Sequence, residues 1–317
     1  MLFSSSAFLT GALSLAATLV SAAPALAGLD QRQTVPNATL IYSNGGWIEC
    51  IRARWTGDLL LPYTNVPELW SLNPLTNIAT KLLTLNGPFT GLTGIAEVQP
   101  DFFAILSGNF STTTGALGVG SWGVWTVDFR NCGDGPPVAT FVKQVPNSGF
   151  FLGAARFDSS NIFIADGGQG ILYKFNVFTG DYTVVSQDIS MNKNGGLAGI
   201  HGVNYLAPYV YYSNTFRGGF WKLQVNSAGV AVGAPVEISA VAAGDRLEEF
   251  ATFYDGTTYV GIQAGGIKQI SPSGVATPFV NVDPPTTVTF GRTLFDWDVL
   301  YIATKFGTVL KAPHLFW

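Results

Sequence analysis

The sequence has little charge, and it contains only two histidines, two cysteines and two methionines. Of its 317 residues 11% are charged and 47% are hydrophobic, and the net charge is −4. An average soluble protein carries about 25% charged residues, so Gly, Ser, Thr and Asn must supply much of the polar surface. This composition is typical of secreted β-proteins. Because no basic run occurs, we expect no nucleic-acid partner.

Long apolar runs are absent beyond the N-terminus. There, the apolar stretch Ala7–Val20 is followed by the small-residue segments "VSAA" and "ALAG", with Pro24 between them. This order is typical of a secretory signal peptide, and we predict one over residues 1–27. Residues 28–317 then form a single domain, secreted or in the lumen of the secretory pathway and not in a membrane. A buried or membrane helix is the alternative for the leader.

A secretory route changes how asparagines and cysteines are interpreted. The triplets at Asn37 and Asn109 are glycosylation sequons. The two cysteines are Cys50 and Cys132, and an oxidising compartment favours one disulfide between them. Two buried free thiols are the alternative.

Helical periodicity is nearly absent, and short Val-, Ile-, Tyr- and Phe-rich runs are bounded by Gly, Pro, Asn and Asp, which predicts strands. The runs repeat as a short apolar segment, a turn and then strands rich in aromatic and β-branched residues. Six copies start near residues 49, 93, 153, 201, 249 and 287. The mean spacing matches propeller blades of ~40–50 residues.

We therefore predict an all-β fold, a six-bladed β-propeller with four-stranded blades. The sixth copy ends near the C-terminus without a fourth strand, and "ATLIYS" near the mature N-terminus can supply it and close the ring. A pair of β-sandwiches is the alternative, which the regular period disfavours.

The first strand of each propeller blade lines the central channel, so its first residue is expected at the channel mouth. Six side chains remote in sequence would then converge on one funnel. They are Glu49, Thr93, Gly153, His201, Glu249 and Thr287. The other histidine, His314, is expected at the surface.

Several stretches carry a family resemblance: "WIECIRARWTGDLLLPYTNVPELWSLNP", "GIAEVQPDFFAILSGNFS", "IFIADGGQGILYKFNVFTGDY", "GIHGVNYLAPYVYYSNT" and "TVTFGRTLFDWDVLYIAT". They resemble the fungal senescence-marker/gluconolactonase-like six-bladed propellers. Within that group the chain is similar to a secreted branch, the hetero-Diels–Alderases of tropolone–sesquiterpene biosynthesis. The resemblance covers essentially the whole mature chain.

The resemblance also allows the metal ligands of the family to be compared with the residues of this chain. Lactonases of the family hold a divalent cation with a Glu, two Asn and an Asp. By the repeat, Glu49 matches the Glu, Gly153 and His201 stand at the Asn positions, and Glu249 replaces the Asp. One ligand is lost and two are changed, so no metal or other cofactor is expected. A divalent cation held by Glu49, His201 and Glu249 is the alternative.

Aromatic residues surround the expected mouth and predict an apolar pocket with a small polar cluster. The expected substrate-binding residues are Trp47, Thr93, Phe151, Gly153, Phe216, Phe250, Thr287 and Phe290. No G-x-S-x-G elbow occurs, which disfavours a serine hydrolase. A cycloaddition develops little charge, so most of its acceleration would come from holding two reactants together, worth up to ~7–11 kcal/mol.

We therefore predict a cofactor-independent hetero-Diels–Alderase with His201, Glu49 and Glu249 as catalytic residues. As the resemblance implies, it would join a tropolone-derived quinone methide to a humulene-type sesquiterpene alkene, so its partners are small apolar substrates. A metal-dependent lactonase or esterase and a non-enzymatic secreted ligand-binding propeller are the alternatives. The sequence gives no oligomeric state.

Overall fold

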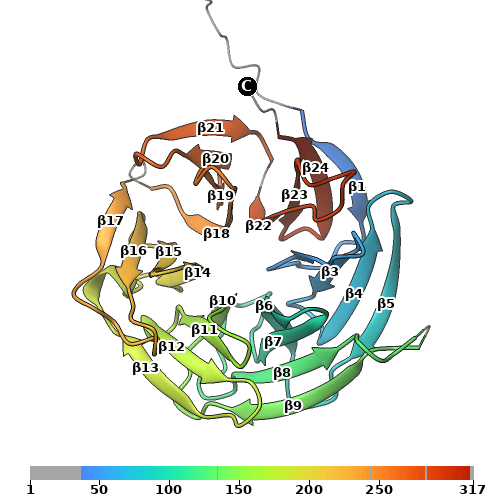
Figure 1. The fold of residues 1–317 in the computed structure, drawn as a ribbon, viewed down its shortest axis with the longest axis horizontal. Coiled ribbons are helices and arrows are strands. Elements are labelled where there is room, and N and C mark those ends of the chain that lie inside the picture. The colour runs from blue at the N-terminus through green and yellow to red at the C-terminus, as the bar shows by residue number, and fades with distance from the viewer. Residues whose placement is uncertain (1–36, 134, 241, 243, 283, 315–317) are drawn as a thin grey trace, which may run out of the picture. The chain divides into compact units, whose positions relative to one another are not determined.

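Six four-stranded antiparallel sheets surround one axis in the part of the chain that the structure describes (Figure 1). The structure is a computed structural model, and it describes residues 37–317 except 134, 241, 243, 283 and 315–317. The predicted signal peptide over residues 1–27 lies outside the described residues. Among the residues described, no helix is long and apolar enough to cross a membrane. The predicted six-bladed propeller is confirmed.

The first three blades follow the chain in order from the axis outward. Blade 1 comprises β2 (Arg52–Ala53), β3 (Leu59–Pro62), β4 (Glu68–Asn73) and β5 (Ile78–Thr84). Blade 2 comprises β6 (Gly91–Gln99), β7 (Phe102–Gly108), β8 (Gly123–Asp128) and β9 (Val138–Gln144). Blade 3 comprises β10 (Phe151–Arg156), β11 (Asn161–Asp166), β12 (Ile171–Asn176) and β13 (Tyr182–Ser186), and the 3-10 helix η1 (Ile189–Met191) follows it.

The last three blades complete the ring. Blade 4 comprises β14 (Ile200–Leu206), β15 (Tyr209–Asn214), β16 (Phe220–Gln224) and β17 (Val236–Ser239). Blade 5 comprises β18 (Leu247–Thr252), β19 (Thr258–Ile262), β20 (Gly266–Ile270) and β21 (Ala276–Val280). Blade 6 comprises β22 (Pro285–Phe290), β23 (Val299–Thr304), β24 (Thr308–Pro313) and β1 (Thr39–Ser43).

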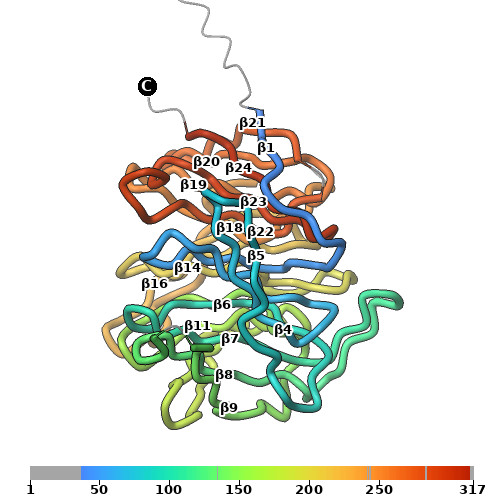
Figure 2. Tube along the Cα trace, turned by 90° about the vertical axis from the view of Figure 1, so that its right-hand side faces the viewer, coloured from blue at the N-terminus to red at the C-terminus, as the bar shows by residue number. Residues whose placement is uncertain are grey.

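The ring closes as the sequence predicts. The N-terminal strand β1 pairs antiparallel with β24, with Thr39 opposite Lys311 and Ser43 opposite Thr308. The two strands lie side by side in both views (Figure 1, Figure 2). Because β1 pairs with β24 in blade 6 and leads directly into blade 1, this pairing connects the last blade to the first.

Burial separates inner from outer strands. The inner strands β6 and β10 are almost wholly buried, whereas the outermost strands β5 and β9 alternate between half-buried and exposed residues. A strand that is covered on both faces can be apolar throughout, while a strand with one wet face alternates. The near-continuous apolar runs at the starts of the repeats follow from this.

In the part of the chain that the structure describes, the hydrophobic core forms six clusters, and each lies between two adjacent blades. For example, Leu60 of blade 1 packs with Phe103 of blade 2, and Phe163 of blade 3 packs with Tyr212 of blade 4. Apolar side chains therefore fill the gaps between blades. Polar groups are left to meet around the axis.

Candidate active site

Each inner strand begins with one extra residue relative to its neighbour. In blade 4, Ile200 pairs with Asn214 but Val203 pairs with Tyr212, so three steps on β14 match two on β15. The same shift occurs at the starts of β6, β10, β18 and β22. Such a bulge leaves its extra residues unpaired and re-aims their side chains.

The bulge sets which residues occupy equivalent positions around the axis. The residue after the last paired position before the bulge is Glu49, Thr93, Leu152, His201, Glu248 or Thr286, in blade order. Three of the predicted ring members, Glu49, Thr93 and His201, hold this position. The prediction was wrong by one residue in the other blades, where Gly153, Glu249 and Thr287 occupy the next position along the strand.

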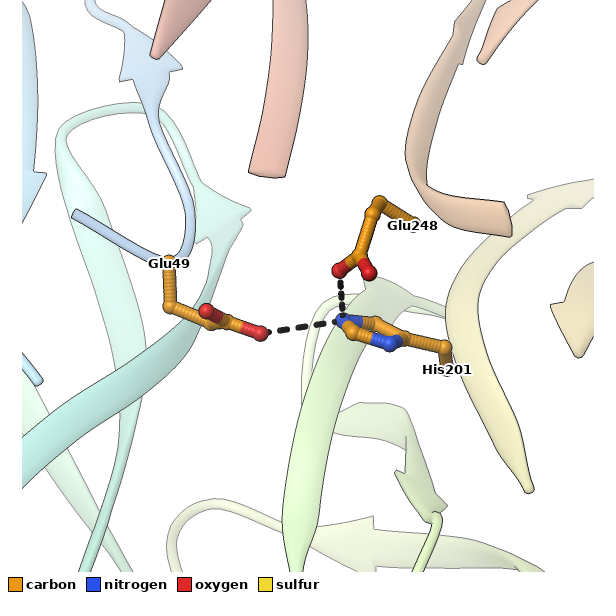
Figure 3. Close-up of side chains that lie close together, drawn as sticks. All are labelled: Glu49, His201 and Glu248. Carbon is orange, nitrogen blue, oxygen red and sulfur yellow. Dashed lines mark ion pairs between the residues drawn. The ribbon is translucent and has the colours of Figure 1, made fainter. Parts of the chain in front are cut away.

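Glu49, His201 and Glu248 converge on one point (Figure 3). The Nε2 atom of His201 lies 3.1 Å from Oε1 of Glu49 and 3.4 Å from Oε2 of Glu248. The three residues are only 4%, 3% and 3% exposed. Three ionisable groups from blades 1, 4 and 5 thus share a site that is nearly free of bulk water.

Second contacts orient two members of this trio. The indole N–H of Trp47 donates to Oε2 of Glu49, so the predicted residue Trp47 does reach the site. The Nδ1 atom of His201 lies 2.7 Å from Oγ1 of Thr215, which sequence reasoning missed. Among the described residues, Nε2 of His201 and Oε1 of Glu248 have no well-aligned hydrogen-bond partner.

Burial and the neighbouring charges favour a protonated site. Burial lowers the pKa of His201, but Glu248 and Glu49 outweigh it and raise that pKa to about 9. Burial, reinforced by Glu49, raises the pKa of the Glu248 carboxyl. Because two acids and a base lie within contact distance, at least one proton is held between them at neutral pH.

Glu249 belongs to a second layer, one residue further along the strand. A Cβ on Gly153 would meet Oε1 of Glu249 at 2.4 Å, so the carboxyl occupies the space that the glycine leaves open. Burial raises the pKa of Glu249 to about 7, against the opposing effect of Arg52. Arg52 itself donates to the carbonyls of Ile95 and Ala154, 3.0 and 3.4 Å away, and so joins blade 1 to blades 2 and 3.

The structure distributes the other predicted binding residues differently. Phe151 and Phe250 are buried in the clusters between blades, because strand alternation turns them away from the axis. Phe290 packs on Phe253, with ring centroids 4.7 Å apart, at the far end of its strand. Thr93 donates to the carbonyl of Phe151 and thereby joins two blades. Thr287 is buried beside Cys50.

Phe216 lies at a cavity next to the trio. The cavity has a volume of about 600 Å³, and Thr215, Phe216, Trp221 and Arg246 are among its lining residues. The guanidinium of Arg246 lies over the face of the Phe216 ring, 4.4 Å from its centroid. Because Thr215 also contacts His201, the cavity and the trio share a wall.

The two cysteines are free thiols, so the predicted disulfide is wrong in this structure. Cys50 is buried at the start of the inner strand of blade 1, and the Cys132 thiol contacts the carbonyl of Phe129. His314 is 6% exposed and lies among Phe253, Tyr259 and Phe290, so its predicted surface position is also wrong. Nothing in the sequence pattern around the last strand signalled this aromatic packing.

The predicted glycosylation sites differ in accessibility. Asn37 is exposed. Asn109 is half-buried, and its Oδ1 accepts a hydrogen bond of 3.1 Å from the Thr90 amide. Glycosylation at either residue stays a prediction.

The trio also fits a divalent cation. One ligand atom from each of Glu49, His201 and Glu248 lies within 4.8 Å of the others, and two carboxylates with one imidazole are a common donor set. Among the described residues, Nε2 of His201 and Oε1 of Glu248 lack a well-aligned hydrogen-bond partner and are available as ligands. Glu248, not the predicted Glu249, completes this set.

Comparison with known proteins gives the site a context. No protein-family model matches the chain. A Sarocladium schorii protein, asR5, named as a candidate hetero-Diels–Alderase, is 23% identical over 313 residues, spanning 84% of this chain and 77% of its own length. This chain therefore resembles a hetero-Diels–Alderase.

Solved structures share the fold of this chain. A luciferin-regenerating enzyme superposes with a TM-score of 0.66 at 12% identity, covering 88% of this chain and 96% of its own. A candidate gluconolactonase superposes with a TM-score of 0.62 at 10% identity, covering 88% and 93%. At these identities the match establishes the fold alone, a six-bladed β-propeller.

Proposed function

We propose that the protein is a hetero-Diels–Alderase that joins a tropolone-derived quinone methide to a humulene-type sesquiterpene alkene. The observation that carries the proposal is a buried imidazole between two carboxyl groups, in a chain similar to a candidate hetero-Diels–Alderase over 84% of its length. The adjacent cavity of about 600 Å³ has room for small-molecule reactants, and the aromatic rings of Phe216 and Trp221 line it together with charged side chains such as Arg246.

The trio suits the first chemical step. A hydroxymethyl precursor becomes a quinone methide when its hydroxyl is protonated and leaves as water, while a ring hydroxyl gives its proton to a base. Glu248, whose pKa burial raises, can supply the first proton as general acid. A neighbouring carboxylate, such as Glu49, can accept the second, so the site ends with the same number of protons.

The second step needs positioning more than charge. The heterodiene of the quinone methide and the alkene form one C–C and one C–O bond together, with no net proton transfer. Holding both reactants in the cavity accounts for most of the acceleration. A hydrogen bond from His201 to the heterodiene oxygen polarises it and lowers the barrier further.

The test is a direct assay of adduct formation. Purified protein is incubated with a hydroxymethyl tropolone precursor and a macrocyclic humulene-type alkene, and the adduct is quantified and its diastereomers are separated. We expect faster formation and a single dominant diastereomer relative to a reaction without protein. A rate and a diastereomer ratio equal to background would refute the function.

A metal-dependent lactonase is the second candidate, favoured by the ligand set of Glu49, His201 and Glu248. A bound divalent cation would polarise a lactone carbonyl, and these three side chains would hold it. Elemental analysis of purified protein, and adduct and lactone assays with and without chelator, separate the two candidates. Adduct formation that survives chelation supports the cycloaddition, and lactone hydrolysis abolished by chelation supports the lactonase.

A further inference from the structure

A single hydroxyl contacts His201 on the side opposite to the two carboxyl groups. Thr215 directly follows β15, and its Oγ1 lies 2.7 Å from Nδ1 of His201. The same Oγ1 donates to the carbonyl of Leu247, 2.8 Å away in blade 5. Thr215 is only 3% exposed, so water does not compete freely for either contact.

The number of protons decides the roles of these atoms. A threonine hydroxyl has one proton, and a backbone carbonyl can only accept. Because that proton is given to Leu247, Oγ1 of Thr215 can only accept from His201. The Nδ1 atom of His201 must therefore carry a hydrogen, and Nε2 is the nitrogen that gains or loses a proton toward Glu49 and Glu248.

We propose that Thr215 is a positioning residue that fixes the hydrogen of His201 on Nδ1 and so directs its exchangeable proton to Nε2, between Glu49 and Glu248. Without the hydroxyl, neutral His201 would place its hydrogen on Nε2 and point its basic nitrogen away from the acids. The consequence for turnover rests on the proposed function, whereas the position of the hydrogen does not.

Blade 1 supplies a matched control. Thr64 directly follows Tyr63, just as Thr215 follows Asn214, and both preceding residues pair with the first position of the bulged inner strand. Thr64 Oγ1 donates to the carbonyl of Leu92, 3.0 Å away in the next blade, as Thr215 does to Leu247. Thr64 makes the same bond between blades, but the hydroxyl that contacts Nδ1 of His201 belongs to Thr215. A change at Thr64 therefore separates a structural role from a role in orienting His201.

The experiment is nitrogen NMR on the full-length chain with 15N-labelled histidine. Only two histidines contribute, and His314 serves as the internal reference. In the wild-type protein, at a pH above the pKa of His201, we expect a hydrogen on Nδ1 and none on Nε2. Thr215→Val should move the hydrogen to Nε2, because a buried N–H at Nδ1 would have no acceptor. Thr215→Ser and Thr64→Val should leave the hydrogen on Nδ1.

Turnover provides the second readout. We expect Thr215→Val to lower kcat roughly 10- to 100-fold with little change in KM, and Thr215→Ser to restore it within about threefold. An unchanged tautomer in Thr215→Val, or the same change of tautomer in Thr64→Val, would overturn the inference. Hydrogen on Nε2 in the unchanged protein would also overturn it, even if a variant failed to fold. A protein that lacks cycloaddition activity would refute the proposed function and leave the NMR result to decide this inference.

Discussion

The two consecutive residues at the bulge of each inner strand form two layers around the axis, and the layers differ in chemistry. The upper layer is Glu49, Thr93, Leu152, His201, Glu248 and Thr286, and the lower layer is Cys50, Gly94, Gly153, Gly202, Glu249 and Thr287. In the upper layer three ionisable side chains meet. In the lower layer three glycines leave space, and the carboxyl of Glu249 occupies the space at Gly153.

The comparison shows that a shift of one residue along the strand changes which side chains a carboxyl group contacts. Glu248 and Glu249 are adjacent in sequence, equally buried and chemically identical, yet only Glu248 lies in contact with His201. A carboxyl in the upper layer can exchange a proton with the imidazole. A carboxyl in the lower layer fills a gap and lies near the charge of Arg52.

The strongest test of this difference compares Glu248→Gln with Glu249→Gln. Both changes keep the side-chain volume and remove the acid. We expect Glu248→Gln to lower kcat for adduct formation by about 10²–10³-fold, since it removes a general acid, and Glu249→Gln to lower it less than about tenfold. Thermal melting of both variants controls for misfolding. Equal losses of kcat would mean that the two layers do not differ in function.

The packing of the lower layer can be tested at Gly153. In Gly153→Ala the new Cβ would meet Glu249 Oε1 at 2.4 Å and the His201 carbonyl at 2.5 Å. We expect a loss of about 1–3 kcal/mol in the free energy of unfolding, measured by urea denaturation. In a Glu249→Ala background the same change should cost less, because one of the three close contacts, the one with Glu249, is gone and those with the backbone of His201 and Val203 remain. An equal cost in both backgrounds would show that the Glu249 carboxyl does not occupy this space.

The two layers should also differ in the pH range over which they affect stability. His201 has its pKa raised from 6.5 to about 9, and Glu249 from 4.5 to about 7. In both cases the folded protein binds more protons than the unfolded chain, so the free energy of unfolding falls as pH rises. The Glu249 contribution is lost between pH 4.5 and 7, and the His201 contribution between pH 6.5 and 9.

Denaturation across this pH range separates the two contributions. We expect a decline on the order of 3 kcal/mol for each group. Glu249→Gln should flatten the lower part of the profile, and His201→Gln the upper part. A stability that rises with pH over either interval would contradict the assigned direction of the shift.

The smallest expected effect concerns the thiols. Burial raises the pKa of the Cys50 thiol to about 12, whereas Cys132 is half-buried at the edge of blade 2. A thiol reagent should therefore modify Cys132 in the native protein, and Cys50 only after unfolding. In protein that is unfolded without a reductant, we expect both thiols to react. If neither thiol reacted, the two cysteines would form a disulfide.

Some of the site was accessible from the sequence. The repeat of strands and turns predicted six blades and the closure by β1, and it placed Glu49, Thr93 and His201 correctly in the upper layer. These predictions needed only the spacing of the repeat and the rule that inner strands face the axis.

The tertiary structure decided the rest. In "LEEF" either glutamate could face the axis, because strand side chains alternate from one face to the other and a bulge of one residue reverses the alternation. The contact of Thr215 with His201 depends on how blade 4 meets blade 5, and a repeat pattern carries no such information. Composition and spacing thus determined the ring of blades, whereas pairing between strands determined which acid meets the imidazole and which hydroxyl orients it.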